Sequence, residues 1–227
     1  GKTVSSLENE LNNNLNEFDN FFIDEFISVT TDVYYSKKTT QNVVGIFNGK
    51  DEALKNEYIV IGAHYDHIGY GGNNSSSRRP YLNEIHNGAD DNASGVSILL
   101  ELVNSIKNIN PKRSVVFVGF GAEEMGLLGS KYFVDSNVIP EDKIHIMINM
   151  DMVGRLNKDQ VLSINGTKTA GVLEDVLNGV LNSSSLKHTF SASGYGPSDH
   201  SSFYVKDIPV LFFFTGAHTD YHTPYDD

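Results

Sequence analysis

Residues 114–124 read SVVFVGFGAEE, an uninterrupted apolar run that ends in two adjacent glutamates. A short continuous run of this kind is typical of a strand that is buried on both faces of a parallel sheet. Two other apolar runs also end beside a polar side chain, since 58–63 precedes His64 and 144–149 precedes Asp151. Because the carboxyl ends of parallel strands lie at one edge of a sheet, we expect these side chains to meet there. The pattern predicts a metal site built from strand ends.

Strand-like and helix-like segments alternate along the chain. We expect helices at residues 5–27, 94–107, 124–134 and 170–181, and strands at 41–47, 58–63, 114–120, 144–149, 160–164 and 209–215. This alternation predicts an α/β fold with a central, mostly parallel β-sheet flanked by helices on both faces. The strands 41–47 and 58–63 are expected to form a hairpin or a near-neighbour pair. The Gly, Asn, Ser and Arg rich stretch 69–87 predicts a long surface loop at the border of the site.

The length and composition of the chain suit a single domain of enzyme size. With 227 residues, of which 39% are hydrophobic, the chain can bury the core of one α/β domain. We therefore predict one domain over residues 1–227, in which residues 1–40 form a helical and extended segment that packs on the rest. The longest apolar run, around residues 210–214, is far shorter than the roughly 20 residues that cross a bilayer, so no membrane insertion is expected.

Charge and cysteine content narrow the classes of partner and of metal ligand. The 17 basic and 29 acidic residues give a net charge of −12, which would repel nucleic acid and anionic membranes. Neither is therefore expected as a partner. The chain has no cysteine, which excludes disulfides and thiolate zinc sites. Any bound metal must be held by oxygen and imidazole ligands, which suit zinc best and would also accept cobalt or manganese.

Two further stretches carry acids or imidazoles in turn-like sequence. Residues 87–95 read NGADDNASG, where two adjacent acids precede a helix. We interpret Asp91 as a carboxylate that bridges two cations and Asp90 as a residue that is structural or lies behind the ligands. A helix cap with favourable dipole charge is the other interpretation, and the two are compatible. His222 lies just beyond the last predicted strand, in a turn stiffened by a following proline, and His218 is its nearby competitor.

The acids that follow the strands differ in what they can do. Side chains two residues apart on an extended segment share a face, so we expect Asp66 to reach the far nitrogen of His64 and fix its tautomer. Adjacent acids point in different directions, so either Glu123 or Glu124 can bind metal while the other does not. An acidic first helical turn is the alternative for this pair. Asp151, at the tip of an apolar run, needs a partner if it is buried, and a cation would serve.

The remaining histidines are assigned to the surface or to positions behind the ligands: His67, His86, His145, His188 and His200.

Five blocks of the sequence resemble the signature of the zinc aminopeptidase family called M28, and they occur in the family's order. They are AHYDH at 63–67, NGADDNASG at 87–95, GAEEMGLLGS at 121–130, NMDMVGR at 149–155 and DYHTPYD at 220–226. The blocks cover the chain from about residue 58 onwards. The resemblance implies a co-catalytic exopeptidase that holds two zinc ions per chain and has a mixed β-sheet flanked by helices.

The resemblance also implies a set of metal ligands. Carried over residue by residue, it makes His64 and Asp151 ligands of one zinc ion. It makes Glu124 and His222 ligands of the other ion, with Asp91 as the bridge. In such enzymes the peptide bond after the bridging aspartate is often cis, and we expect the same here.

Further roles come from the same resemblance. It implies that Asp66 orients His64, that Glu123 is the general base and that Tyr221 stabilises the oxyanion. We also expect Tyr195 and Phe203 to line the pocket for the first side chain of the substrate. The implied substrates are peptides with a free amino terminus.

Three alternatives remain open at this point. A cyclase that acts on amino-terminal glutamine has a similar scaffold with one zinc ion, but His64 with its partner Asp66 argues for two. A two-zinc carboxypeptidase would need a cation to hold the substrate carboxylate, and Arg155 is the only basic residue inside a signature block. A binding module without catalysis would be expected to have lost ligands, whereas the full set is present.

The resemblance carries two expectations about context. It implies a secreted or periplasmic protein. The chain ends at Asp227, five residues after His222, whereas members of the resembled family commonly continue. We therefore expect either a truncated or an unusual carboxyl terminus.

Overall fold

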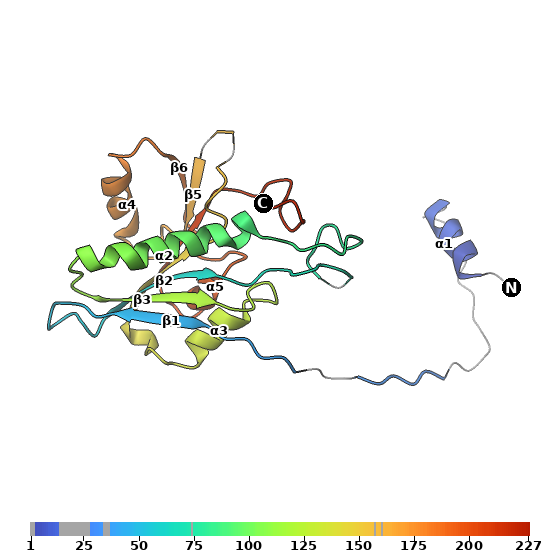
Figure 1. Ribbon diagram of the computed structural model, residues 1–227, viewed down its shortest axis with the longest axis horizontal. Coiled ribbons are helices and arrows are strands. Elements are labelled where there is room, and N and C mark those ends of the chain that lie inside the picture. Colours follow the sequence, from blue (N-terminus) through green and yellow to red (C-terminus); the bar gives the residue numbers. More distant parts are fainter. Residues whose placement is uncertain (1–2, 14–27, 34–36, 74, 157, 160) are drawn as a thin grey trace. The chain divides into compact units, whose positions relative to one another are not determined.

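A mixed β-sheet forms the centre of the computed structural model (Figure 1). The structure describes residues 3–13, 28–33, 37–73, 75–156, 158–159 and 161–227. Within these residues, seven strands pair in the order β1-β3-β2-β4-β7-β5-β6. Their bounds are β1 Val43–Phe47, β2 Tyr58–His64, β3 Ser114–Phe120, β4 Ile144–Met150, β5 Val161–Asn165, β6 Lys187–Ser191 and β7 Val210–Phe214.

The strand directions are mostly parallel. The central strands β3, β2, β4 and β7 run parallel to one another, and β6 is parallel to β5. The strand β1 is antiparallel to β3, and β5 is antiparallel to β7. The predicted mixed, mostly parallel sheet is therefore confirmed. As a result, the carboxyl ends of β2, β3 and β4 lie together at one edge of the sheet.

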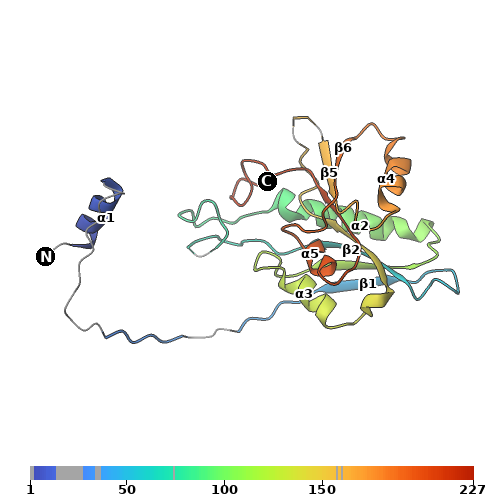
Figure 2. The ribbon, with the colours of Figure 1, turned by 180° about the vertical axis from the view of Figure 1, so that it is seen from behind.

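Helices cover both faces of the sheet (Figures 1 and 2). They are α2 Gly95–Ser105, α3 Leu128–Asp135, α4 Leu173–Leu181 and α5 His200–Tyr204, with a kinked, irregular turn Ala89–Ser94 before α2 and 3-10 turns at Ile106–Asn108 and Glu141–Lys143. Side chains of β3 alternate between the two faces. Phe117 packs in the cluster of Leu99 from α2, whereas Phe120 packs in the cluster of Phe133 from α3. The expected layers are thus present.

Several elements differ from the sequence-based expectation. The strands β1 and β2 do not pair, because β3 lies between them. The helix expected from residue 124 begins only at Leu128, because Gly126 and Leu127 have positive φ angles of 100° and 59°, which are incompatible with a right-handed helix. The strand β6 and the helix α5, of five residues each, were not predicted.

The amino-terminal residues form a unit of their own. Contacts divide the chain into Gly1–Lys38 and Thr39–Asp227. The helix α1 (Val4–Asn13) confirms the start of the helix predicted at 5–27, and residues 14–27 lie outside the described part of the chain. That residues 1–40 pack on the rest of the chain stays a prediction. None of the described helices combines the length and apolar character that a membrane span needs.

Candidate metal centre

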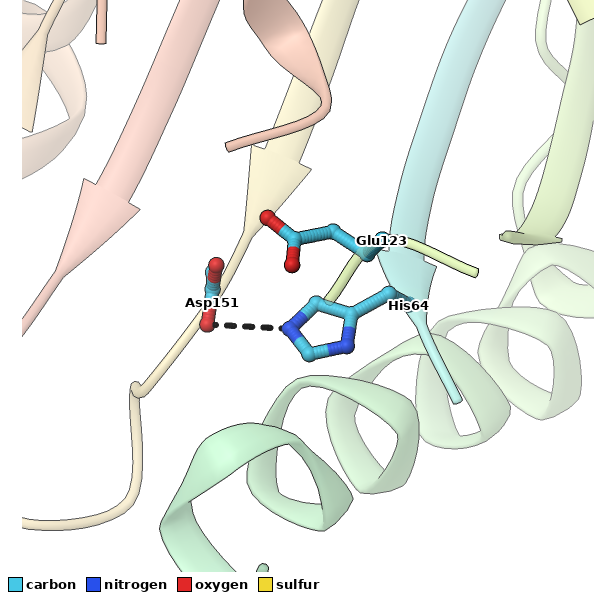
Figure 3. A group of neighbouring side chains, drawn as sticks. All are labelled: His64, Glu123 and Asp151. Atoms are coloured by element: carbon cyan, nitrogen blue, oxygen red, sulfur yellow. Dashed lines mark ion pairs between the residues drawn. The ribbon is translucent and has the colours of Figure 1, made fainter. Parts of the chain in front are cut away.

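Polar side chains from separate segments meet at the carboxyl ends of the central strands. They are His64 at the end of β2, Asp91 before α2, Glu123 and Glu124 after β3, Asp151 after β4 and His222 after β7. Figure 3 shows His64, Glu123 and Asp151 pointing toward one another from three different segments. The predicted convergence of strand ends is therefore present in the fold.

The carboxylate of Asp91 lies between two imidazoles. Its Oδ1 is 3.2 Å from Nε2 of His64, and its Oδ2 is 3.1 Å from Nε2 of His222. Each imidazole nitrogen faces one more carboxylate: Nε2 of His64 is 3.4 Å from Oδ1 of Asp151, and Nε2 of His222 is 3.2 Å from Oε2 of Glu124. The site thus has two halves that share Asp91. The peptide bond between Asp91 and Asn92 is cis, as expected.

Backbone carbonyls orient both imidazole rings. Nδ1 of His64 lies 3.1 Å from the carbonyl oxygen of Asp66, and Nδ1 of His222 lies 3.0 Å from that of Ser76. A carbonyl oxygen can only accept, so each Nδ1 donates and, in the neutral ring, each Nε2 has a free lone pair. The carboxylate of Asp66 is 3.9 Å from Nδ1 of His64. The expectation that this carboxylate fixes the tautomer is therefore corrected, because the main chain of Asp66 makes the closer contact.

The carboxylate of Asp66 instead holds the turn after β3. Its two oxygens accept the backbone N–H groups of Glu123, at 3.0 Å, and Glu124, at 3.3 Å. A half-buried carboxylate with two such contacts ties the loop after β2 to the turn after β3. This arrangement orients the two glutamates relative to His64.

Ion pairing outweighs burial at most of the acids and imidazoles. Burial would raise the pKa of Asp91, but hydrogen bonds with His222 and His64 hold it well below its usual range. Burial would also raise the pKa of Glu124, which its imidazole partners lower to about 2. Burial would lower the pKa of His222, but Asp91 and Glu124 raise it to about 10. The pKa of His64 is raised in the same way by Asp151 and Asp91.

Glu123 differs electrostatically from the other acids. Burial raises its pKa to about 9, and the negative charges of Asp151, Asp199 and Glu124 add to this effect against the opposing charge of His64. Among the described residues it forms no ion pair. A carboxyl group with so high a pKa is suited to accept and release a proton during a reaction.

The donor atoms of the site fit divalent cations. One ligand atom each from His64, Glu123 and Asp151 lie within 4.8 Å of one another, and so do atoms of His67, Asp91 and Glu124. Within the described residues, no Lys or Arg forms an ion pair with the four acids of the site. Oxygen and imidazole donors in a carboxylate-rich, largely buried space suit zinc and similar ions.

A cavity adjoins the donor atoms. Besides the acids and imidazoles, it is lined by Met152, Asn165, Pro197, Phe212, Phe214, Ala217 and Tyr221. The ring of Tyr221 stacks on His222 with centroids 3.8 Å apart, and burial together with nearby carboxylates raises the pKa of its hydroxyl. Tyr221 therefore remains a protonated hydrogen-bond donor beside the site.

Neither residue expected to line the substrate pocket borders this cavity. Phe203 has no exposed surface and packs in the core, 6.1 Å from the ring of Phe120. Tyr195 is 67% exposed and contacts the ring of Tyr204, outside the cavity. The prediction for Phe203 is wrong because α5, which was not predicted, carries this residue into the core. The ring of Tyr195 does not border this cavity, and its contact with substrate stays a prediction.

Asp226 anchors the segment that carries the shared carboxylate. Its buried side chain accepts the backbone N–H of Asp90, 3.1 Å from each oxygen, and that of Asp91 at 3.0 Å. Asp90 in turn accepts the backbone N–H of Gly154 at 2.8 Å and lies 3.4 Å from Nε2 of His218. This supports the structural interpretation of Asp90 and explains why His218 does not face the shared carboxylate.

Asp226→Ala is expected to destabilise the metal-free protein. The substitution leaves two buried N–H groups without an acceptor, at a cost of about 1–3 kcal/mol each. Urea unfolding in the presence of a chelator measures the change. The neighbouring acid Asp227 is exposed, so Asp227→Ala should change the free energy of unfolding by less than about 0.5 kcal/mol. Equal unfolding curves for the two variants would contradict this role of Asp226.

His67 was expected at the surface or behind the ligands, and its position agrees with the second alternative. Its side chain is largely buried, with Nδ1 2.7 Å from Oε1 of Glu124. Its place in the block that also carries His64 was the available signal that it lies near the site. The buried His86 bonds Ser77 and does not reach the acids.

By its fold and its donor atoms, the chain falls in the class of α/β domains with a candidate metal site of carboxylates and imidazoles at the strand ends. The family model described as Peptidase family M28 matches residues 42–227, and the chain belongs to this family. The resemblance seen in the five blocks is thereby confirmed.

Individual relatives are similar over most of the chain. "Aminopeptidase YwaD" of Bacillus subtilis is 32% identical over an alignment that covers 85% of this chain and 40% of that protein. "Leucine aminopeptidase 2" of Trichophyton equinum is 28% identical over 84% of this chain and 37% of its own length. The chain thus spans about two fifths of the curated relatives it matches.

Solved structures have the same fold. The zinc aminopeptidase BSAP from Bacillus subtilis superimposes with a TM-score of 0.63 at 28% identity, over 82% of this chain and 44% of that one. An aminopeptidase from Aneurinibacillus sp. strain AM-1 gives a TM-score of 0.64 at 29% identity, over 82% and 42% of the two chains. These similarities confirm the predicted exopeptidase fold.

Proposed function

We propose that this domain is the catalytic part of a co-catalytic two-zinc aminopeptidase. The observation that carries the proposal is the position of the Asp91 carboxylate between two imidazoles. One of its oxygens lies 3.2 Å from Nε2 of His64, and the other lies 3.1 Å from Nε2 of His222. A bridging carboxylate between two cations needs this arrangement. His64 and Asp151 would hold one zinc ion, and Glu124 and His222 the other. Membership of family M28 and the names of the relatives support the same reaction.

Glu123 is the general base in this proposal. When bound, a pair of divalent cations would lower the pKa of water and polarise the scissile carbonyl. The carboxylate of Glu123 takes the proton of the attacking water and delivers it to the leaving nitrogen. Its place in a largely buried site gives it the high proton affinity that this shuttle requires. The hydroxyl of Tyr221 can donate to the developing oxyanion.

The acids of the cavity favour substrates with a free amino group. Glu123 and Asp151 border the same cavity, and their carboxyl oxygens can accept hydrogen bonds from an ammonium group. The carboxypeptidase alternative would need a free cation, but Arg155 donates to Asp220 at 2.8 Å and to Nδ1 of His218 at 3.2 Å. Arg155 also does not line the cavity. These contacts support an aminopeptidase over a carboxypeptidase.

The test combines a metal count with a choice of substrates. We expect two zinc ions per chain by elemental analysis, and hydrolysis of aminoacyl reporters with a free amino group. The same reporters with a blocked amino group should not be cleaved. One zinc ion with lactam formation from amino-terminal glutamine would indicate the cyclase. Cleavage of amino-blocked peptides from the carboxyl end would indicate a carboxypeptidase, and absence of metal and of activity would indicate a binding module.

Phe214→Ala is expected to reduce selectivity for large apolar first residues. Phe214 lines the cavity beside Met152 and stacks on Phe212, so its loss removes apolar contact with a bound side chain. We expect kcat/KM for leucyl and phenylalanyl reporters to fall by about 10-fold or more, and that for alanyl reporters to fall less. Tyr195→Ala is the matched control, since this exposed ring lies outside the cavity. A uniform loss across reporters would show that Phe214 does not contact the substrate.

A further inference from the structure

A third imidazole approaches the half of the site that contains His222. Nδ1 of His67 lies 2.7 Å from Oε1 of Glu124, the oxygen that does not face His222. The rings of His67 and His222 meet edge to face with centroids 5.8 Å apart. The side chain of His67 is only 10% exposed. This histidine is therefore part of the inner wall of the site.

Apart from the contact of Nδ1 with Glu124, the ring nitrogens of His67 have no partner among the described residues. Both are shielded from solvent, and neither has a hydrogen-bond partner among the described residues. Oε1 of Glu124 is near Nδ1 but is likewise without a hydrogen bond, so the contact is close without being directional. Buried polar atoms normally have partners. In the neutral ring that carries its proton on Nε2, Nδ1 has a lone pair close to the carboxylate of Glu124, and a cation would satisfy both groups.

The surrounding backbone fixes the His67 ring in this place. A Cβ atom added to Gly88 would lie 2.8 Å from Cγ and Cδ2 of the ring, so the ring packs directly on the glycine backbone. Gly88 has a positive φ of 63°, which glycine adopts without strain. On another side, the His86 ring has its centroid 6.5 Å away. The close packing leaves the imidazole little freedom to turn away from Glu124.

We propose that His67 is an additional ligand, through Nδ1, of the cation held by Glu124 and His222. One donor atom each of His67, Asp91 and Glu124 lie within 4.8 Å of one another, as a shared cation requires. The inference rests on the proposed function, because it assumes that the site binds two divalent ions. It adds a ligand to the set of five that the five signature blocks imply.

The extra ligand makes the two halves of the site unequal. The half near His222 then has four protein ligands: Asp91, Glu124, His222 and His67. The half near His64 has three protein ligands, which are His64, Asp151 and the shared Asp91. The carboxyl of Glu123 lies beside them without being counted as a ligand. Zinc with four protein ligands is typical of a closed site, whereas three leave an open position for chemistry. The open position therefore lies beside the proposed base.

The test counts the imidazoles that bind metal. The probe is Co²⁺ loaded into the metal-free chain, and the measurement is proton NMR of the far-shifted, exchangeable imidazole N–H signals. We expect three such signals, from His64, His222 and His67, and two in His67→Gln. We also expect His67→Gln to bind one of the two Co²⁺ ions at least about tenfold more weakly in a chelator competition, with the other ion less affected.

Two variants serve as references for the count. His222→Gln removes a proposed ligand from the same half and should lose one signal in the same way. His188→Gln changes a half-buried histidine on β6 whose ring contacts Phe190, away from the acids, and should keep all three. Glutamine at residue 67 can still donate to Glu124, so unchanged affinity for both ions would show that His67 only positions that carboxylate.

The possible failures are distinguishable. Two shifted signals in the unaltered chain with both ions bound would overturn the inference and leave the proposed function intact. Failure to bind two Co²⁺ ions would instead overturn the two-metal proposal, and the inference with it. If His67→Gln does not fold, the ¹⁵N shift of Nδ1 in the zinc-loaded unaltered chain decides, because coordination moves this resonance and a free nitrogen keeps its ordinary shift.

Discussion

Glu123→Gln is expected to keep both cations and to lose about 10²- to 10⁴-fold in kcat, the usual contribution of a general base. Glutamine has nearly the same shape but cannot accept the proton of water. The carboxyl of Glu123 has no ion pair among the described residues, unlike the neighbouring acids, so its charge is not needed to orient an imidazole. Steady-state hydrolysis of an aminoacyl reporter, with the metal content measured on the same sample, checks the prediction.

Glu124→Gln is the matched control for this experiment. It makes the same chemical change one residue further on, where the carboxylate faces Nε2 of His222 at 3.2 Å. We expect this variant to lose metal together with activity. Donor atoms of Glu123 also lie within reach of a cation shared with His64 and Asp151. Loss of one cation in Glu123→Gln would therefore make this residue a ligand and would leave the base unassigned.

The metal-free form of Glu123→Gln should differ from the parent in its pH dependence. In the folded chain the pKa of Glu123 is about 9, above its ordinary value of 4.5. Between these values the folded state holds a proton that the unfolded state has released, so the free energy of unfolding falls as the pH rises through this range. The glutamine side chain does not titrate, so the free energy of unfolding of the variant should decrease less over this pH range. Urea unfolding at several pH values, with a chelator present, measures it, and parallel pH profiles would contradict the raised pKa.

Local sequence patterns were enough to predict which side chains converge. A continuous apolar strand places the residue after it at the sheet edge, and parallel strands share that edge, so His64 and Asp151 could be placed together before any pairing was known. Asp91 required the additional signal of two acids in a glycine-rich turn. These patterns depend on strand direction alone and not on which strand lies beside which.

Features that depend on tertiary contacts could not be predicted in this way. The insertion of β3 between β1 and β2 is a matter of long-range pairing, which no local period encodes. Phe203 lies in a five-residue helix that is too short for periodicity to reveal, so its burial in the core was missed. His67 lies in a loop, where the alternation of side chains no longer indicates direction. The contact of Asp66 with the backbone of Glu123 and Glu124 likewise joins two separate loops.

Asp91→Ala is expected to lower the affinity of the chain for both cations at once and to abolish measurable hydrolysis. The two oxygens of Asp91 face His64 and His222 separately, so one substitution removes a ligand from each half of the site. Changes in groups behind a ligand already cost about 10- to 100-fold in metal affinity, and loss of a direct ligand should exceed this. Titration of the metal-free chain with zinc against a chromophoric chelator measures each affinity.

Two further variants distinguish a ligand that both cations share from a ligand of one cation only. Asp151→Asn alters a carboxylate that faces only His64, so it should lower the affinity for one cation and leave the affinity for the other largely unchanged. Asp90→Asn changes the adjacent acid, whose carboxylate accepts the N–H of Gly154 and faces His218 rather than the shared centre, and it should keep both cations. If Asp91→Ala lowered the affinity for one cation only, the carboxylate would belong to a single half of the site. The two imidazoles would then define separate sites, and the co-catalytic proposal would lose its geometric basis.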